Sequence, residues 1–470
     1  MINSEIFRAY DIRGIVDYSL TEDAVFLIGK SIGEKTLLNN NKQVVVARDG
    51  RLSSPRLIAK LKDGIISVGC NVLDIGLVPT PVLYFAASTL NILSAVMLTG
   101  SHNPPNYNGL KIILNGQAIY GEQILAIQDL IVNNQYRSID MQHIGQSLEM
   151  NIVDNYINYI VDNINLDNLK NFKQNFKQKF KIVIDCGNGA AAVVAEKLFT
   201  ALGVECIPLY CEVDGNFPNH HPDPGDPKNL VILQQTVLDN NADLGIAFDG
   251  DGDRLGVIDN KGNIIWPDRY LMLFAKDILL RNNNATIIYD VKSSNYLKDI
   301  IKQAGGRPLM WKTGHSLIKA KMQETKALLA GEMSGHVFFK DRWFGFDDGL
   351  YTGARLIELI VGSGKTLFDI CVSLPRTFAT SELVIKSSEK AKHDIIDKLI
   401  NLITEQYTNI STVDGLRLEF DDCWGVVRSS NTTPSLIARF EANSLVSLDK
   451  IKKIFKDYLL TIDPSLLVPF

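Results

Sequence analysis

Ala95-Val-Met-Leu98 followed by Thr99-Gly-Ser-His-Asn-Pro-Pro-Asn-Tyr-Asn108 is the stretch that decides how this chain is organised. The apolar residues predict a buried strand, and the Gly- and Pro-rich residues after them predict a rigid loop at its end. The loop carries Ser101 and His102, and Lys111 closes the segment. A hydroxyl nucleophile beside cationic donors suits a site where negative charge gathers. A polar surface turn is the alternative interpretation of this stretch taken alone.

A second loop, Asp249-Gly-Asp-Gly-Asp-Arg254, follows the apolar stretch Leu244-Gly-Ile-Ala-Phe248. Along an extended backbone, the alternating residues Asp249, Asp251 and Asp253 project their carboxylates to one side. Carboxylates this close repel one another unless a divalent cation lies among them. The spacing therefore predicts a metal site. Mg²⁺ suits it, because Mg²⁺ keeps coordination positions open for phosphate oxygens.

Other motifs fit the glycine-containing loops less well. An EF-hand loop needs Gly at its sixth position and Glu at its twelfth, where this chain has Arg254 and Asn260. A solvated acidic turn stays as the alternative to a metal site. Gly187-Asn-Gly189 lacks the third glycine of a dinucleotide fingerprint. It is instead typical of tight packing at the start of a helix.

A third loop, Gly331-Glu-Met-Ser-Gly-His336, follows the strand-like run Ala327-Leu-Leu-Ala330. Glu332 and Ser334 lie two residues apart, so they point the same way and suit paired sugar hydroxyls. His336 is able to transfer a proton. A plain turn is the alternative interpretation.

A fourth loop, Arg428-Ser-Ser-Asn-Thr-Thr-Pro434, combines a guanidinium with hydroxyl and amide side chains. Such donors, together with backbone N–H groups, predict a phosphate cradle of the nest type, and a solvated loop is the alternative. The four loops together supply the parts that a serine needs for phosphoryl transfer.

In their order and approximate spacing, the four loops resemble the α-D-phosphohexomutase superfamily, in the pattern of bacterial phosphomannomutase/phosphoglucomutase. Phe7-Arg-Ala-Tyr-Asp-Ile-Arg-Gly14 and Lys312-Thr-Gly-His315 match as well. The resemblance extends from about residue 5 to about residue 440. Phosphoglucosamine mutases usually carry Ala in place of Gly100, Gln in place of Met333, and a phosphate loop closer to Arg-x-Ser-Gly-Thr-Glu-Pro. The resemblance therefore favours the first subgroup.

The resemblance implies a hexose phosphate mutase with a phosphoserine at Ser101, one Mg²⁺ per site, and glucose or mannose 1,6-bisphosphate as intermediate and activator. The implied metal ligands are Ser101, Asp249, Asp251 and Asp253. The implied catalytic residues are Ser101, His102, Lys111, Arg13, Arg254, His315 and His336. The implied substrate-binding residues are Tyr10, Lys292, Glu332, Ser334, His336, Arg428, Ser430, Asn431 and Thr432. The general base stays open among Lys111, His315 and His336.

Alternating strands and helices predict α/β domains with mostly parallel sheets and ligands at the strand carboxyl ends. The last hundred or so residues predict an antiparallel α+β domain instead. We expect three similar mixed α/β-sheet domains at 1–147, 148–262 and 263–370, and the α+β domain at 371–470, each contributing one of the four loops. The resemblance implies that they surround a central cleft. A hinge is expected at about residues 363–375.

Bulk properties exclude several classes of partner. A chain of 470 residues is too long for one core. Its net charge of −5, with dispersed Lys and Arg, predicts neither nucleic-acid nor membrane binding. The six cysteines show no metal-ligand spacing and predict reduced thiols. With no signal peptide or membrane-spanning run, a cytoplasmic protein is expected. Hexose phosphates are its expected partners, and a monomer is favoured.

Substrate preference stays open at this stage. A site that accepts the sugar in two orientations is expected to tolerate either configuration at C2, so both mannose and glucose phosphates are predicted substrates. Among mutases, phosphoglucosamine mutase is the nearest alternative. A Mg²⁺-dependent sugar phosphatase and a catalytically silent sugar-phosphate-binding protein are the alternatives from other classes.

Overall fold

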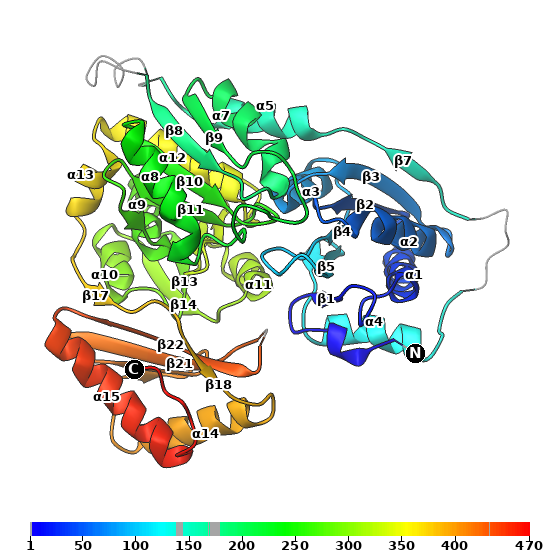
Figure 1. Ribbon diagram of the computed structural model, residues 1–470. Coiled ribbons are helices and arrows are strands. Elements are labelled where there is room, and N and C mark those ends of the chain that lie inside the picture. The colour runs from blue at the N-terminus through cyan, green and yellow to red at the C-terminus, as the bar shows by residue number, and fades with distance from the viewer. Residues whose placement is uncertain (1, 138–143, 168, 170–178, 432) are drawn as a thin grey trace.

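The computed structural model describes residues 2–137, 144–167, 169, 179–431 and 433–470. Within these residues the strands form four sheets. The first three sheets, which are mixed and covered by helices, form domains I, II and III, and the fourth forms domain IV (Figure 1). The predicted fold class, mixed α/β domains followed by an α+β domain, is confirmed.

Domain I has a mixed sheet in the order β1-β5-β4-β2-β3-β7, with β6 paired to β5. Its strands are β1 Ile12–Ile15, β2 Gln43–Arg48, β3 Asn71–Leu77, β4 Ala95–Leu98, β5 Tyr107–Leu114, β6 Gln117–Ala118 and β7 Ser147–Glu149. Its helices are the 3₁₀ turn η1 Ser4–Ile6 and α1 Glu22–Leu38, α2 Ser54–Ile66, α3 Thr80–Thr89 and α4 Glu122–Val132. Because β7 pairs with β3, this sheet runs past the boundary expected at residue 147.

Domain II has the sheet order β12-β11-β10-β8-β9. Its strands are β8 Lys181–Asp185, β9 Glu205–Leu209, β10 Leu244–Phe248, β11 Leu255–Asp259 and β12 Ile264–Ile265. Its helices are α5 Val153–Asn163, η3 Ala190–Val193, α7 Ala195–Ala201, η4 Pro227–Leu230 and α8 Val231–Asp239. The Ala-rich helix expected after Gly189 begins as the 3₁₀ turn η3, because the turn at Gly187–Gly189 packs against the loop after β10.

Domain III has the sheet order β14-β13-β15-β16. Its strands are β13 Thr286–Asp290, β14 Arg307–Trp311, β15 Leu329–Gly331 and β16 Val337–Phe339. Its helices are α9 Pro267–Arg281, α10 Asn295–Gln303, α11 His315–Thr325, α12 Gly349–Ser363 and α13 Leu367–Val372. The segment expected as a hinge, 363–375, thus contains a short helix.

Domains I, II and III deliver their loops in the same way. In each, a buried strand with a parallel neighbour turns into an antiparallel one, from β4 to β5, from β10 to β11 and from β15 to β16. The serine, aspartate and Glu332 loops are these connections. The expected placement of ligands at strand carboxyl ends follows from this shared unit.

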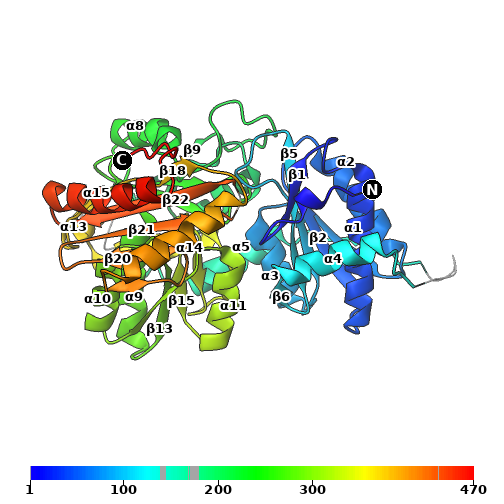
Figure 2. The same ribbon diagram turned by 90° about the horizontal axis from the view of Figure 1, so that it is seen from below.

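Domain IV is antiparallel throughout, in the order β17-β22-β21-β20-β19, with β18 paired to β22. Its strands are β17 Phe378–Ala379, β18 Leu383–Lys386, β19 Ile410–Ser411, β20 Leu416–Glu419, β21 Cys423–Ser429 and β22 Ser435–Ala442. Its helices, α14 Ala391–Thr404 and α15 Leu445–Ile462, cover one face of the sheet (Figure 2). The Arg428 loop joins β21 to β22.

The hydrophobic cores divide the molecule into two parts. Domains I, II and III share one continuous core, in which Phe85, Tyr156 and Trp343 pack ring against ring. Domain IV has a separate core. It meets domain III through a small apolar cluster of Val291, Trp424 and Val426 and through polar contacts, among them the 2.6 Å hydrogen bond that Arg417 donates to the carbonyl of Val291. Domains joined by an interface that is partly polar are able to move relative to one another. Among the described helices, none is both long and apolar enough to cross a bilayer.

Candidate active site

Ser101 stands on the loop after β4 in a strained, left-handed conformation with φ 48°. Its backbone N–H donates 2.8 Å to Thr99 Oγ1. Its buried hydroxyl lies 3.0 Å from Asp249 Oδ2 and 3.1 Å from His102 Nδ1. The serine of domain I and the aspartate loop of domain II, far apart in sequence, therefore meet directly.

Arg51, which was not among the predicted site residues, supports the serine loop from its buried side. Its side chain has no exposed surface. The guanidinium donates to backbone carbonyls of the loop at 2.6 to 3.0 Å, those of Ser101, Asn103, Pro104 and Tyr107. A single cation thus fixes the curvature of the whole loop, because each of these carbonyls needs a donor once it is buried.

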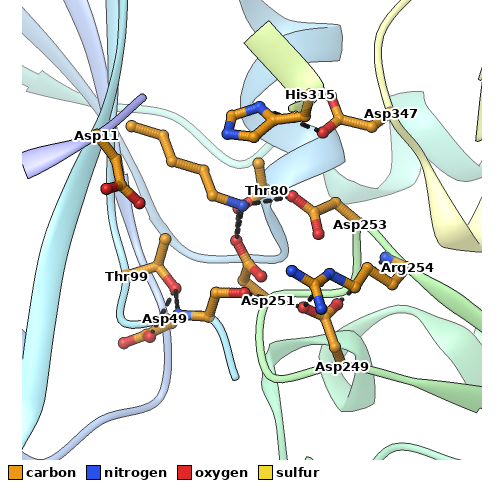
Figure 3. Close-up of polar contacts among 12 residues, drawn as sticks. Asp11, Asp49, Thr80, Thr99, Asp249, Asp251, Asp253, Arg254, His315 and Asp347 are labelled. Atoms are coloured by element: carbon orange, nitrogen blue, oxygen red, sulfur yellow. Dashed lines mark hydrogen bonds and ion pairs between the residues drawn. The ribbon is translucent and has the colours of Figure 1, made fainter. Parts of the chain in front are cut away.

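Asp49 and Arg51 together form a bracket under the serine loop, and Figure 3 shows Asp49 beside Thr99. It accepts from Arg51 Nε at 3.1 Å, Thr99 Oγ1 at 2.9 Å and the N–H of Gly100 at 3.1 Å. A Cβ on Gly100 would lie 2.4 Å from the Arg51 guanidinium, so only glycine leaves room for it. The sequence did carry a signal: Asp49-Gly-Arg51 follows β2, a parallel neighbour of β4, at the same sheet edge.

The carboxylates of Asp249, Asp251 and Asp253 are fully buried, and each offers an oxygen within 4.8 Å of the others (Figure 3). Asp251 Oδ1 is buried and accepts no hydrogen bond from any described residue. Lys111 Nζ donates 2.7 Å to Asp251 Oδ2 and also to Asp253 Oδ2. Buried carboxylates with an orphaned oxygen fit a divalent cation. The set of side chains predicted to hold a metal is therefore assembled.

Burial raises the pKa of Asp249 well above its ordinary value, and Asp253 and Asp251 add to that shift. Burial works against ionisation of Lys111 as well, but Asp251 and Asp253 outweigh it and raise the lysine pKa well above its ordinary value. A general base would need a lowered lysine pKa, so Lys111 in this arrangement is a cation and not a base.

Gly250 permits the contact between the serine loop and the aspartate loop, since a Cβ there would lie 2.3 Å from the Ser101 carbonyl.

His102 does not supply the positive charge expected of it. Burial lowers its pKa well below the ordinary value, and the neighbouring Arg254 and Arg13 lower it further. At neutral pH the ring is uncharged and acts as a hydrogen-bond partner of Ser101. The positive charge facing the serine end of the cleft comes instead from Arg13, Arg254 and Lys111, which line it together.

The Glu332 loop forms a hydrogen-bonded cluster. His336 Nδ1 lies 2.7 Å from Ser334 Oγ and 3.1 Å from Glu332 Oε2, and its Nε2 lies 3.3 Å from Asp253 Oδ1. Burial lowers the pKa of His336, but Asp253 and the hydrogen bonds to Asp253 and Glu332 raise it to about 9. Arg254 Nε lies 3.3 Å from His336 Nε2. This cluster connects the Glu332 loop to the aspartate loop.

His315 begins α11 and stacks on His336 with ring centroids 5.7 Å apart. Its Nδ1 lies 3.7 Å from Asp347 Oδ2 (Figure 3). Burial lowers its pKa well below the ordinary value, and Lys319 and Lys111 lower it further. The two adjacent rings therefore differ in charge at neutral pH.

The phosphate loop of domain IV faces the same cleft. Arg428 Nε donates 2.7 Å to Asp414, and the buried Arg428 Nη2 has no hydrogen-bond acceptor among the residues that the structure describes. Asn431 Nδ2 donates to Tyr10 Oη, which in turn donates 3.2 Å to the carbonyl of Thr313. Thr432, predicted to bind phosphate, lies outside the described residues.

Lys292, another predicted substrate-binding residue, is buried beside β13. Its Nζ donates to Glu382 of domain IV and lies 3.8 Å from Asp290. Burial works against its charge, but Glu382 and Asp290 raise the lysine pKa above its ordinary value. This cation therefore lies where domains III and IV meet.

A cleft of about 690 Å³ brings the predicted residues of all four domains together. Apart from the buried aspartates and Thr432, every predicted site residue lines it: Tyr10, Arg13, Ser101, His102, Lys111, Arg254, Lys292, His315, Glu332, Ser334, His336, Arg428, Ser430 and Asn431. A larger cavity of about 1000 Å³ lies between α11 and β6, beside Tyr84 and Lys319. It contains none of the predicted residues, so the smaller cleft is the candidate site.

Family models match the chain along most of its length. They describe the phosphoglucomutase/phosphomannomutase alpha/beta/alpha domains I, II and III at residues 4–138, 154–262 and 266–378. The C-terminal domain of the same family matches residues 381–457. The chain belongs to the phosphoglucomutase/phosphomannomutase family. The resemblance to phosphomannomutase/phosphoglucomutase that the four loops indicated is therefore confirmed.

Individual members of the family are similar over the whole chain. A phosphomannomutase/phosphoglucomutase of Pseudomonas aeruginosa is 50% identical over 99% of this chain and 98% of its own. A phosphoglucomutase of Neisseria meningitidis is 47% identical over 100% of this chain and 99% of its own. The crystal structure of a Burkholderia thailandensis family member superposes with a TM-score of 0.91, at 45% identity and 100% coverage of both chains.

Proposed function

We propose that this phosphohexomutase moves a phosphoryl group between the 1- and 6-positions of hexose phosphates, through a phosphoserine at Ser101 and a hexose 1,6-bisphosphate. The protein is an isomerase of the family to which it belongs. One observation carries the assignment of the site: the Ser101 hydroxyl, 3.0 Å from Asp249, shares a single cleft with the Arg428 loop. A sugar with a phosphate at each end needs two phosphate-binding ends.

At the serine end, the chain has to align the phosphoryl group and neutralise its charge, because phosphoryl transfer needs little covalent assistance. Arg13, Arg254 and Lys111 supply the fixed cations, and neutral His102 supplies a hydrogen-bond partner for the Ser101 oxygen. The bracket of Asp49 and Arg51 fixes the backbone that carries the Ser101 side chain, because Arg51 donates to the Ser101 carbonyl.

Mg²⁺ is the proposed metal. The carboxylates of Asp249, Asp251 and Asp253, with the oxygen of Ser101, would hold it. When bound, the ion supplies positive charge against the transferring phosphoryl oxygens. Lys111 binds Oδ2 of Asp251 and Oδ2 of Asp253. Among the described residues, none donates a hydrogen bond to Oδ1 of Asp251, which leaves this oxygen for the ion. Oxygen donors alone favour Mg²⁺ over softer metals.

At the other end, Arg428, Ser430, Asn431 and Thr432 would hold the phosphate that does not react. The buried Nη2 of Arg428 has no hydrogen-bond acceptor among the described residues, which suits a phosphate oxygen. Glu332 and Ser334 lie between the two ends and would bind the ring hydroxyls. Because the sugar has to bind in both orientations, we propose that mannose and glucose phosphates are both substrates.

His315 is the proposed general base for the sugar hydroxyl. Its ring is unprotonated at neutral pH and lines the cleft, so it is able to accept a proton there. His315→Gln is expected to lower kcat by about 10²-fold with little change in KM. Unchanged turnover in this variant, with a large loss in His336→Gln, would move the role to His336.

The first experiment follows phosphate on the protein. The full chain is treated with glucose 1,6-bisphosphate, its intact mass is measured, and conversion of mannose 1-phosphate and glucose 1-phosphate is assayed in Mg²⁺. We expect one added phosphate, absent from Ser101→Ala and present in Ser88→Ala, a control on the exposed end of α3. Turnover should depend on the bisphosphate.

Other outcomes would contradict the proposal in distinguishable ways. Free phosphate released in place of the isomer would indicate a phosphatase. Phosphorylation with turnover of glucosamine phosphate alone would indicate a phosphoglucosamine mutase. No phosphorylation and no turnover would leave a sugar-phosphate-binding protein.

A further inference from the structure

Two thiols of domain II lie in contact, away from the catalytic groups. Cys186 directly follows β8, and Cys211 lies two residues beyond the end of the neighbouring parallel strand β9. Their sulfur atoms are 3.3 Å apart. Cys186 is fully buried, whereas Cys211 is partly exposed. Neither sulfur belongs to the proposed phosphoryl-transfer machinery.

The backbone holds the two strand ends in register. The N–H of Cys186 donates 3.1 Å to the carbonyl of Leu209, and the N–H of Asn188 donates 2.9 Å to that of Tyr210. Tyr210 has a left-handed backbone with φ 51°, which is uncommon for an aromatic residue. Directly after this turn, the Cys211 sulfur lies 3.6 Å from the Ile184 carbonyl on β8. The sulfur contact is therefore set by the fold.

We propose that Cys186 and Cys211 are a reversible disulfide site. The two sulfur atoms already lie in contact, at the ends of neighbouring parallel strands. A disulfide bond is about 2.05 Å long. The sulfurs therefore have to approach by about 1.2 Å, through rotation of the two side chains and a small shift of the backbone that carries them.

The chemistry requires a two-electron oxidant, and hydrogen peroxide is sufficient. The Cys211 thiolate attacks one peroxide oxygen, the O–O bond breaks, and hydroxide leaves and becomes water. The Cys186 sulfur then attacks the Cys211 sulfur; the S–S bond forms, the S–O bond breaks, and a second water leaves with the Cys186 proton. Two thiols and one peroxide thus give one disulfide and two waters.

The exposure of the two sulfurs sets their roles. Partly exposed Cys211 meets the oxidant first. The hydrogen bond from Cys211 and the burial of Cys186 raise the pKa of the Cys186 thiol well above its ordinary value. Cys186 is therefore the resolving partner, reacting only with a sulfur already beside it.

The thiol pair is one short turn from the metal loop. The turn Gly187–Gly189 follows Cys186, and the N–H of Ala190 donates 2.9 Å to the carbonyl of Gly250. A Cβ on Gly189 would lie 2.9 Å from that same oxygen. Gly250 stands between Asp249 and Asp251, so a shift of the Cys186 backbone would reach those carboxylates. We expect the disulfide to lower turnover severalfold through this contact.

The test oxidises the full-length protein with hydrogen peroxide and maps its peptides without reduction. We expect a Cys186–Cys211 cross-linked peptide, a loss of two alkylatable thiols, and reversal of both by dithiothreitol. Cys211→Ser should lose the cross-link. Cys206→Ser is the matched control, since Cys206 lies on the same strand β9 and should leave the cross-link unchanged.

A cross-link to Cys206, or Cys211 oxidised to sulfinic acid with Cys186 still free, would overturn the proposal. The same samples are assayed as isomerases. Lost turnover that dithiothreitol restores in the wild type, and that Cys211→Ser does not show, supports the coupling to Gly250. Unchanged turnover in the cross-linked chain would overturn that coupling.

Discussion

The serine loop and the phosphate loop lie in one cleft, and the chain supports them differently. The serine loop belongs to the core that domains I, II and III share, and Arg51 and Asp49 fix it from below. The phosphate loop belongs to domain IV, which has its own core. Its Asn431 reaches domain I through the Tyr10 hydroxyl. The reacting end is fixed by the shared core, whereas the recognising end is attached through a small apolar cluster and polar contacts.

This difference matches what the two ends have to do. The phosphoryl-transfer end needs fixed atoms, because an error of about 1 Å costs roughly 10²-fold in rate. The other end has to accept a phosphate from either end of the sugar and release the intermediate to turn. Domain IV is therefore expected to move relative to domains I–III during turnover.

Asp251→Asn should have the largest effect, because it acts at the fixed end. It removes a carboxylate from the proposed Mg²⁺ site and one partner of Lys111. We expect kcat to fall by about 10³-fold or more. Differential scanning calorimetry should show that Mg²⁺ raises the Tm of the wild type and leaves the variant unchanged. A variant with near-normal turnover would contradict the assignment of the aspartates.

The same measurement has a pH dependence. Burial and the neighbouring aspartates hold the folded pKa of Asp249 above its unfolded value. The metal-free protein therefore loses stability as pH rises from the unfolded pKa through the folded one, and a bound cation restores it. The Mg²⁺-dependent gain in Tm should therefore grow as pH rises through the folded pKa of Asp249. A gain that does not change with pH would show that protons do not compete for the site.

Gly100→Ala should have the next largest effect. The new Cβ would lie 2.4 Å from the Arg51 guanidinium, so the bracket beneath Ser101 has to shift. We expect kcat to fall by about 10- to 100-fold while KM changes little. Gly362→Ala is the matched control, because its Cβ meets no atom within 4 Å. If both variants had the same kcat, Arg51 would not fix the reacting end.

These two loops also separate what the sequence predicts from what it cannot. Strand-end position and residue type were enough to predict the serine and aspartate loops, because a buried strand determines where its loop emerges. Arg51 was missed although it follows β2 at the same edge, because its partners are backbone carbonyls, which no side-chain pattern reveals.

The charges of the site were not predictable either. His102 is neutral and His336 is protonated with a pKa of about 9, although both are buried histidines beside a reacting loop. Burial disfavours the charge on both rings, and only His336 has carboxylates close enough to outweigh it. Those carboxylates come from domains II and III, so the balance exists only in the fold.

Arg428→Gln tests the recognising end and should have a smaller effect on kcat than on KM. The variant loses the charge-assisted hydrogen bond to Asp414 and the unused Nη2 donor. A charged hydrogen bond contributes roughly 1.5–3 kcal/mol, so KM for mannose 1-phosphate should rise by about 10- to 100-fold. Steady-state kinetics with the 1-phosphate and the 6-phosphate should show the same rise, because one loop serves both orientations.

Tyr10→Phe should have the smallest effect and tests the contact between the two ends. It removes the hydroxyl that donates to the Thr313 carbonyl and accepts from Asn431, and it leaves the ring packed against Gly314. A neutral hydrogen bond contributes about 1 kcal/mol, so we expect turnover to change by about two- to tenfold. If closure of domain IV limits the rate, the loss should appear mainly in kcat. Adding Asn431→Ala should cause no further loss, because the two side chains share one hydrogen bond. Additive losses in the double variant would mean that Tyr10 and Asn431 act separately, and that the recognising end is not held to the fixed end by this contact.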